Sequence, residues 1–587
     1  MTPRAIETEV VTVEDRLSIE SADRQAFGAY FDKGSHDVKL AGHLLAGHLT
    51  MQPHPEWILP SAIDWTADPF RDSNWKFQYL MLRWLDPLRR RAEAGDEAAA
   101  QMWIRYAEDW VRQNPPDSPT SPFAWRDMAD GIRALEFCSA LPFISTYGPK
   151  NLDWLVPSIR QHAEWLADPA HMGVANHALH QHQGLFVCGA VLQDAGLRDL
   201  AVRRMSELFA ENYDAQGINA EGAIAYHFAN YHWWSTARRR LELEGVTPPR
   251  GMEMLSEAPV ALAHATKPSG TFVSIGDTDG GRPKQMTHPA AVYAFTRGAQ
   301  GEPPADTVKL YESGYLFVRS GWGRGTRAFE DETFLSLAFG RADKVHGHPD
   351  GLSLTYSSRG TEWVTDPGKY RYGRDEMRQY CQSRESHSLV YLEGRSYDSG
   401  TTVQCVRRHF DDDVYDLTLM DEGYQGVTIR RRLIYSVTGE YIVVLDEVRS
   451  EEECTAVQNW QLGHDVNVER QRRGVDLRAG DDARAVLRFT GTTPETEIVR
   501  GRENPLAGWV STGWRTRAPA SAIRFRKSGQ HFRFITLLAA GRPGVTPEVS
   551  AKPMETPGGV HLEIITGESG ETMMIDKQSV QISPVVL

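Results

Sequence analysis

Apolar residues recur at helical spacing through the first half of the chain. Between residues 103 and 111 they fall at positions 103, 106, 107, 110 and 111, which is one face of an amphipathic helix. The same reasoning predicts further helices over residues 155–166, 178–194, 199–213 and 222–243. Proline-containing segments at 115–116, 169 and 248–249 separate them. No short period repeats, so we expect successive helical hairpins arranged as an arc or toroid, not a regular solenoid.

The pattern changes beyond a glycine- and proline-rich segment at residues 297–304. Short alternating or continuous apolar runs follow at 333–339, 415–419, 441–445, 532–538 and 560–565. Turn residues separate them at short intervals, which favours an antiparallel β-sandwich over a parallel sheet. We therefore expect an α+β multidomain protein with a helical domain over residues 1–300 and a β-sandwich over 301–540. Residues 541–587 are expected to form a terminal β-sheet segment, separate from the sandwich or part of it.

Composition limits the function classes. The 587 residues are too many for one ordinary core, which agrees with two to three domains. With 64 basic and 78 acidic residues the net charge is −14, which gives no support for nucleic-acid binding. The five cysteines are scattered and form no CxxC pair, so a disulfide framework is not expected.

The sequence also bears on location. Residues 1–20 lack the apolar core of a signal peptide, and no apolar run is long enough to cross a membrane. We expect a cytoplasmic protein with no membrane partner. A homo-oligomer is compatible with the sequence.

Candidate chemistry gathers at residues 346–368. His346 and His348 alternate, so on an extended backbone they project to the same face, and Asp350 continues that face. A predicted hairpin over 352–365, with its turn at 358–360, would carry Asp366 back towards the two histidines. These side chains suit metal binding or proton transfer. The alternative is a surface hairpin with solvated histidines.

Two spots in the helical half carry further polar candidates. Asn176 and His177 precede a predicted helix, where Asn is also a common helix cap. Tyr226 shares a helix face with Trp233, and a core tyrosine is the alternative reading. His227 lies about a quarter-turn from Tyr226.

An ordered series of short motifs resembles the heparinase II/III-like polysaccharide lyases, a group that includes alginate, oligoalginate and heparan sulfate lyases. The motifs are Trp110–Pro115, Trp125 with Arg133, His162–Leu166, Asn176-His177, Tyr226-His227, Ile275–Asp279, Ser313–Tyr315, the His346/His348/Asp350 group, Asp366–Gly368 and Ser386–Ser388. In the last motif Ser388 stands where the family usually has Asn. The resemblance implies an N-terminal (α/α) toroid followed by antiparallel β-sandwich layers, in agreement with the hydrophobic pattern.

The reaction that the resemblance implies is β-elimination at a uronic acid. Asn176 and His177 would bind and neutralise the substrate carboxylate, where charge builds in the transition state. Tyr226 would transfer the proton, and His346 would be the second proton-transfer or neutralising group. A tyrosine after Asp366 contributes in some relatives, and we choose Tyr380 over its neighbours Tyr370 and Tyr372.

The resemblance implies further sites. His227, Trp233 and Arg378 are expected to contact substrate. Several relatives hold a metal, usually zinc, and the matching positions here are His348, Asp366 and His387. Two imidazoles and a carboxylate suit Zn²⁺, which we expect to be structural and to order the loop that carries His346.

Two other functions are weighed against the lyase. A glycoside hydrolase would need two opposed carboxylic acids, for which Glu221 with Asp279 or Asp350 are candidates. A non-catalytic carbohydrate-binding protein would not require Asn176-His177, Tyr226 and His346 together. The expected partner is an anionic uronic-acid glycan, with exolytic cleavage of oligoalginate as first choice and of glycosaminoglycan fragments as second. A sulfated substrate would need a basic cluster, which the sequence does not show clearly.

Overall fold

The structure, a computed structural model, describes residues 17–23, 36–282, 286–553, 560–565, 570–576 and 579–585. Most of the segment that bears on a signal peptide, residues 1–16, lies outside them. The chain divides into two compact units. The first comprises Met1–Tyr213 and Asn230–Leu255, and the second comprises Asp214–Ala229 and Ser256–Leu587. The predicted domain boundaries near residues 300 and 540 stay predictions.

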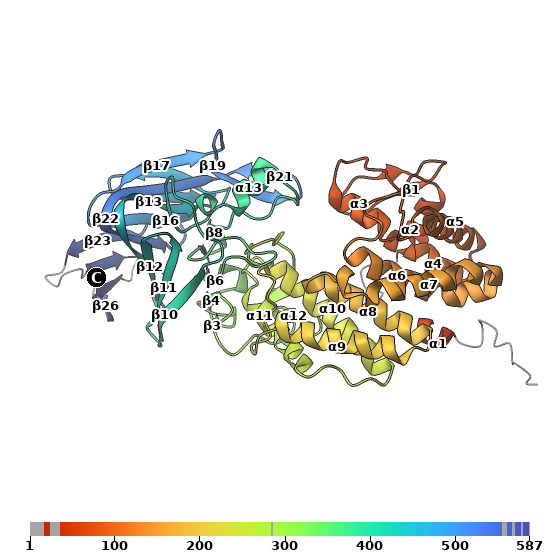
Figure 1. The fold of residues 1–587 in the computed structure, drawn as a ribbon. Coiled ribbons are helices and arrows are strands. Elements are labelled where there is room, and N and C mark those ends of the chain that lie inside the picture. Colours follow the sequence, from red (N-terminus) through yellow and green to blue (C-terminus); the bar gives the residue numbers. More distant parts are fainter. Residues whose placement is uncertain are drawn as a thin grey trace, which may run out of the picture. The chain divides into compact units, whose positions relative to one another are not determined.

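The first unit is helical. Its elements are α1 (Ile19–Asp23), α2 (Asp37–Leu45), β1 (His48–Leu49), β2 (Trp57–Ile58), α3 (Ser73–Leu80), α4 (Asp86–Glu93), α5 (Glu97–Gln113), α6 (Met128–Tyr147), α7 (Leu152–Ala167), α8 (Ala175–Val191) and α9 (Ala195–Asn212). Helix α10 (Ile224–Leu243) begins in the second unit and continues in the first. Helices α6, α8 and α9 lie side by side (Figure 1). Asp96 and Asp194 cap α5 and α9 by accepting hydrogen bonds from the backbone N–H groups of Ala99 and Leu197.

Several motif residues of the first unit are structural. The guanidinium of Arg133 lies 3.7 Å from the ring centroid of Trp110 and donates to His162 Nε2 over 3.0 Å. Trp125 packs on His162 with 4.5 Å between ring centroids. Burial lowers the pKa of Arg133 to about 9. This buried stack ties α5, α6 and α7 together, which accounts for these motifs without a role in chemistry.

The second unit carries the larger sheets, and α11 (Ala258–His264) and α12 (Pro289–Phe295) precede them in sequence. A five-stranded antiparallel sheet has the order β3 (Val308–Tyr311), β4 (Tyr315–Arg319), β5 (Phe334–Ala338), β7 (Leu354–Ser358), β8 (Thr361–Val364). The predicted hairpin is confirmed as β7 and β8, which pair across a turn at Arg359 and Gly360. Gly360 adopts a φ of +74°, a left-handed conformation that glycine favours.

A larger antiparallel sheet follows. Along its main path the strands are β14 (Asn467–Gln471), β15 (Gly474–Ala479), β16 (Ala483–Thr490), β22 (Ser521–Ala540), β13 (Ile442–Gln461), β12 (Val427–Ser436), β11 (Val414–Tyr424), β10 (Thr402–Phe410) and β6 (Gly340–Arg341). Strand β17 (Glu495–Arg500) pairs with β22, and β9 (Val390–Leu392) pairs with β13. Helix α13 (Glu376–Gln382) and two short hairpins, β18 (Arg502–Glu503) with β19 (Leu506–Ala507) and β20 (Trp509–Gly513) with β21 (Thr516–Pro519), lie between these strands in sequence.

The end of the chain forms a four-stranded sheet. Its strands are β23 (Glu548–Pro553), β24 (Val560–Ile565), β25 (Gly570–Ile575) and β26 (Val580–Val585). Leu562 and Met573 of this sheet share a buried cluster with Ile434, Val443 and Leu537 of the larger sheet. The terminal strands therefore pack on the larger sheet and bury part of one of its faces.

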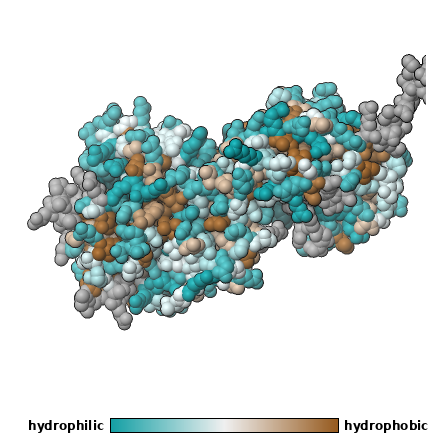
Figure 2. All heavy atoms as spheres, turned by 90° about the horizontal axis from the view of Figure 1, so that it is seen from below, coloured by the Kyte–Doolittle hydropathy of each residue, from teal (hydrophilic) through white to brown (hydrophobic). Residues whose placement is uncertain are grey.

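No helix among the described residues has both the length and the apolar character needed to cross a membrane. Figure 2 shows one face of the molecule, on which hydrophobic residues are interspersed among hydrophilic ones.

Candidate active site

Three loops of the second unit meet at His346. The backbone N–H of His346 donates to the carbonyl of Glu221 over 2.9 Å, and its carbonyl accepts from the N–H of Asp277 over 2.9 Å. The backbones of the three loops approach each other closely. A Cβ placed at Gly276, where φ is +59°, would lie 2.6 Å from the carbonyl oxygens of Gly222 and His346. Only glycine fits at position 276.

The imidazole of His346 lies flat against the ring of Tyr226. Their centroids are 3.4 Å apart and their planes differ by 10°. Tyr226 is half-buried in the first turn of α10, and its hydroxyl forms a hydrogen bond with the hydroxyl of Tyr372. Nε2 of His346 lies 3.7 Å from a carboxylate oxygen of Glu221. The structure thus brings together two predicted residues, Tyr226 and His346, with two polar neighbours.

Asp277 fixes the orientation of two imidazoles at once. Its Oδ2 lies 3.1 Å from Nδ1 of His346, and its Oδ1 lies 3.1 Å from Nε2 of His348. Nη1 of Arg378 donates to Oδ1 of Asp277 over 2.5 Å. Although burial favours the neutral acid, these hydrogen bonds hold the pKa of Asp277 well below its usual range.

An ionised carboxylate only accepts, so each imidazole nitrogen facing Asp277 carries the proton. Nε2 of His346 and Nδ1 of His348 then keep their lone pairs. One carboxylate therefore prepares His346 to take a proton and His348 to bind a metal.

The hydroxyl of Tyr226 is held in its protonated form. Burial raises its pKa well above the usual value, and the adjacent Tyr372, Asp277 and Glu221 raise it further. A hydroxyl that keeps its proton suits a general acid in the resting state.

The tyrosine beside Tyr226 is Tyr372, not the residue chosen from the sequence. The hydroxyl of Tyr380 accepts from the backbone N–H of Gly508 over 3.1 Å and packs in a separate buried cluster with Met377 and Cys381. Tyr372 stands instead beneath Lys369, whose ammonium lies 4.1 Å from the Tyr372 ring centroid. Tyr372, and not Tyr380, is therefore the tyrosine that contacts Tyr226.

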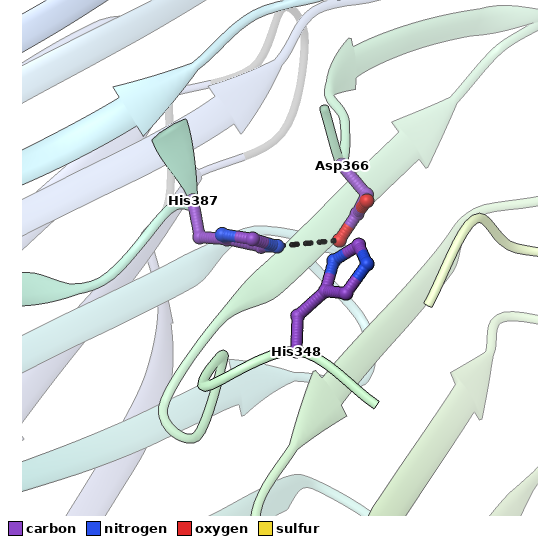
Figure 3. Close-up of side chains that lie close together, drawn as sticks. All are labelled: His348, Asp366 and His387. Atoms are coloured by element: carbon purple, nitrogen blue, oxygen red, sulfur yellow. Dashed lines mark ion pairs between the residues drawn. The ribbon is translucent and has the colours of Figure 1, made fainter. Parts of the chain in front are cut away.

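His348, Asp366 and His387 converge as the sequence predicts. Each is buried, and one ligand atom from each lies within 4.8 Å of the other two. Figure 3 shows both imidazoles near the Asp366 carboxylate. Nε2 of His387 lies 3.5 Å from Oδ2 of Asp366.

The cluster fits a small divalent cation such as Zn²⁺. Nδ1 of His348 and Nε2 of His387 are buried and form no hydrogen bond with any described residue. The opposite nitrogens are anchored, by Asp277 and by the carbonyl of Ser383 at 2.7 Å from His387 Nδ1. Burial raises the pKa of Asp366 and lowers that of His387 to about 3. A cation would stabilise the ionised carboxylate between neutral imidazoles, the ligand set that zinc prefers.

Asn176 and His177 lie in the first unit, at the start of α8. Asn176 is buried, whereas the side chain of His177 is 35 % exposed and pairs through Nδ1 with Asp127. Burial favours neutral Asp127, yet the hydrogen bond from His177 lowers its pKa. Two residues next to Asn176 and His177 have strained backbone conformations. Asp127 and Ala175 have positive φ values of +62° and +52°.

The three residues predicted to contact substrate are buried or partly buried. His227 is buried, its Nδ1 accepts from the N–H of Asn219 over 3.2 Å, and burial lowers its pKa to about 4. Arg378 is also buried and is held by Asp277. His227 and Arg378 are therefore supporting residues rather than contacts on an open surface. Trp233 packs partly buried against the core of the first unit, beside His180.

Sequence reasoning missed Asp277 as the organising residue. It stands within the motif Ile275–Asp279, but a single loop carboxylate carries no periodicity that reveals its partners. The adjacent Gly276 was the available signal, since a glycine before an acid can mark a close approach of backbone.

Both halves of the chain match family models. Residues 35–279 match the model described as heparinase II/III N-terminus, and residues 302–551 match heparinase II/III-like, C-terminal. A heparin-sulfate lyase of Bacteroides stercoris is 21% identical over 575 residues, covering 88% of this chain and 84% of that protein.

Solved structures share the fold. A heparinase III structure matches with a TM-score of 0.79 at 16% identity, over 97% of this chain and 94% of that one. The heparan sulfate lyase HepC of Pedobacter heparinus matches with a TM-score of 0.70 at 17% identity, over 97% and 93%. A chondroitin AC lyase of Streptomyces coelicolor A3 matches with a TM-score of 0.55 at 12% identity, over 96% and 92%. The predicted fold class, a helical toroid followed by antiparallel β-sandwich layers, is confirmed.

Proposed function

Because the chain belongs to the heparinase II/III-like family and is a polysaccharide lyase, we propose that it cleaves uronic-acid glycans of the glycosaminoglycan type by β-elimination. The observation that carries the mechanism is the stacked pair of Tyr226 and His346, with His346 oriented by Asp277. The names of the relatives support a glycosaminoglycan substrate, so we propose it ahead of oligoalginate and reverse the order that the sequence favoured.

The reaction needs three functions. The C5 proton next to a uronate carboxylate is weakly acidic, so a positive or hydrogen-bonding group must stabilise the charge that builds on that carboxylate. The family resemblance assigns this role to Asn176 and His177. A base then removes the C5 proton, and an acid protonates the leaving O4 as a double bond forms between C4 and C5.

We assign the base to His346 and the acid to Tyr226. Nε2 of His346 keeps its lone pair because Nδ1 faces the Asp277 carboxylate. Tyr226 keeps its proton because burial and acidic neighbours raise its pKa. Tyr372 donates to or accepts from the Tyr226 hydroxyl, so it positions that proton.

His348, Asp366 and His387 would hold Zn²⁺ as a structural ion. The ion would fix His348, which shares the Asp277 carboxylate with His346. The protein's own contribution is to position the His346 loop through these contacts.

The test is a panel of uronic-acid glycans, including heparan sulfate, chondroitin sulfate and alginate, followed by ultraviolet absorbance. Elimination creates a conjugated double bond, so absorbance should rise with the cleaved glycosaminoglycan. New reducing ends without absorbance would instead show hydrolysis, for which Glu221 and Asp279 were candidates. Binding without cleavage would show a carbohydrate-binding protein.

We also propose release from a chain end, supported by the net charge of −14, which disfavours long-range attraction of a long polyanion. Sizing the products of a defined oligosaccharide over time checks this. Monosaccharide or disaccharide should appear at the earliest time points. An early ladder of intermediate lengths would mean mid-chain cleavage.

Replacement of Asp277 should separate chemistry from substrate binding. Asn in Asp277→Asn offers one uncharged acceptor oxygen where two imidazoles and Arg378 need a carboxylate. We expect kcat to fall about 10- to 100-fold with little change in KM, the usual cost of losing such an orienting partner. The protein should also bind less zinc, because the His348 tautomer is no longer fixed.

Asp279→Asn is the matched control, two residues along the same loop. Asp279 pairs with Lys369 and is 41 % exposed, so its loss should leave zinc content unchanged. Equal zinc content and equal kcat in Asp277→Asn and wild type would contradict the role given to Asp277.

A further inference from the structure

Five arginines gather on one face of the larger sheet. They are Arg407 on β10, Arg430 and Arg432 on β12, Arg449 on β13 and Arg533 on β22, and together we call them the arginine face. The strand register places them in adjacent rows. Arg407 and Arg432 both pair with Thr418, and Arg430 and Arg533 both pair with Glu447. They line a hollow of about 180 Å³.

Among the described residues, the arginine face holds more guanidinium groups than carboxylates. The buried carboxylate of Asp416 is shared by Arg432, at 2.7 Å, and Arg407, at 3.2 Å. Glu447 is shared in the same way by Arg449 at 2.9 Å and Arg533 at 3.3 Å.

The pKa of Glu447 reflects the positive electrostatic potential of the arginine face. Burial alone would raise its pKa, but hydrogen bonds from His531 and Arg449 and the charge of Arg533 lower it to about 2. Arg430 is exposed and forms no ion pair with any described residue. Asp576 lines the same hollow, so among the described residues five guanidinium groups meet three carboxylates, in a protein whose net charge is −14.

The rest of the same sheet face is covered. Ile434, Val443 and Leu537 lie further along the strands that carry the arginines, and they are buried beneath the terminal sheet. The fold therefore closes the apolar part of this face and leaves Arg430 and Arg449 exposed, with 61 % of the Arg449 side chain accessible. Guanidinium groups crowded in this way repel each other unless an anion joins them.

We propose that the arginine face is a second glycan-binding site, which holds sulfate or carboxylate groups of an anionic chain apart from the catalytic residues. Guanidinium presents paired N–H donors that match both groups. That the ligand is a glycan rests on the proposed function, whereas the preference for anions rests on the arginines. The face would supply the basic cluster that a sulfated substrate requires.

The experiment measures binding with polymers that contain no uronic acid and therefore cannot undergo elimination. Dextran sulfate and carboxymethyl dextran carry the two anions on one backbone, and plain dextran carries neither. Calorimetric titration of the full chain should show binding of the charged polymers that weakens as salt is added. The double variant Arg430→Ala/Arg449→Ala should bind at least tenfold more weakly. If the double variant binds only dextran sulfate more weakly, sulfate is the group that the site recognises. If it binds both charged polymers more weakly, the site accepts either anion.

Two further variants control for loss of binding by other causes. Arg478→Ala removes an arginine of β15 that is 53 % exposed and pairs with Glu469, so its binding should match wild type. Arg430→Glu reverses one charge without breaking an ion pair of the described residues and should weaken binding even if the double variant is unstable. Unchanged affinity in Arg430→Glu and in the double variant would overturn the proposal.

The result is independent of the proposed reaction. The rate of cleavage of the shortest accepted oligosaccharide should be unchanged in these variants, since none of them touches the catalytic residues. A protein that cleaves no glycan but loses dextran sulfate binding in Arg430→Glu would keep this site and lose the proposed function.

Discussion

Tyr226→Phe should lower kcat by about 100-fold to 10,000-fold, the usual contribution of a general acid or base. The substitution removes only the hydroxyl, so the ring can still lie flat on His346 at 3.4 Å between centroids. The melting temperature and the affinity for substrate should therefore stay close to wild type. Steady-state kinetics on the glycan identified by the absorbance panel, with calorimetric binding of the same glycan, measure both quantities.

Other tyrosines of the chain provide the controls for this result. Tyr231→Phe lies on the same helix, five residues further along, and should keep full turnover. Tyr372→Phe should lower kcat, because it removes the hydrogen-bond partner of the Tyr226 hydroxyl. Tyr380→Phe should affect stability instead, since the N–H of Gly508 loses its acceptor. Wild-type kcat in Tyr226→Phe would return Tyr226 to a purely structural role.

The architecture was predictable because burial leaves a period in the sequence. The stripe from Trp103 to Trp110 is the buried side of α5, and the alternation from Leu354 to Ser358 is β7, although both faces of that strand are buried. Such periods arise wherever one face of an element is buried, so they appear without knowledge of the partner surface. The helix ends depend on capping residues such as Asp96. A cap bonds to backbone only a few residues away, so the sequence can predict it as well.

The site was only partly predictable, for a physical reason. The set His348, Asp366 and His387 came from the family resemblance, and all three are residue types that can ligate a metal. Tyr372 and Tyr380 could not be told apart, because both follow Asp366 and the path of the loop decides which one meets Tyr226.

Asp277 and the arginine face depend on pairings between distant segments. Asp277 meets His346 across 69 residues of sequence, and Arg533 meets Glu447 across 86. On β12 three arginines are consecutive, but Arg431 lies on the opposite face of the sheet and pairs with Asp446, so the run does not predict the cluster. Only the register of the sheet assembles the charge.

Loss of the metal ligands should have the second largest effect. His387→Ala removes one of three ligands from a fully buried cluster, and three protein ligands are the minimum for a stable zinc site. Elemental analysis should find about one zinc per wild-type chain and much less in the variant. Because a bound ion stabilises only the folded state, the melting temperature should fall by at least ~3 °C.

His464→Ala is the control for nonspecific loss of a histidine, because His464 is 50 % exposed and lies outside the cluster. It should keep both the zinc and the melting temperature. Treatment of wild type with a chelator should reproduce the shift of His387→Ala, and added Zn²⁺ should reverse it in wild type alone. Turnover should fall with the metal because His348 and His346 share the Asp277 carboxylate, so a loosened His348 frees the His346 loop. A wild-type protein that keeps its melting temperature and kcat after its metal is removed would refute the structural ion. In that case the buried nitrogens of His348 and His387 would need another partner.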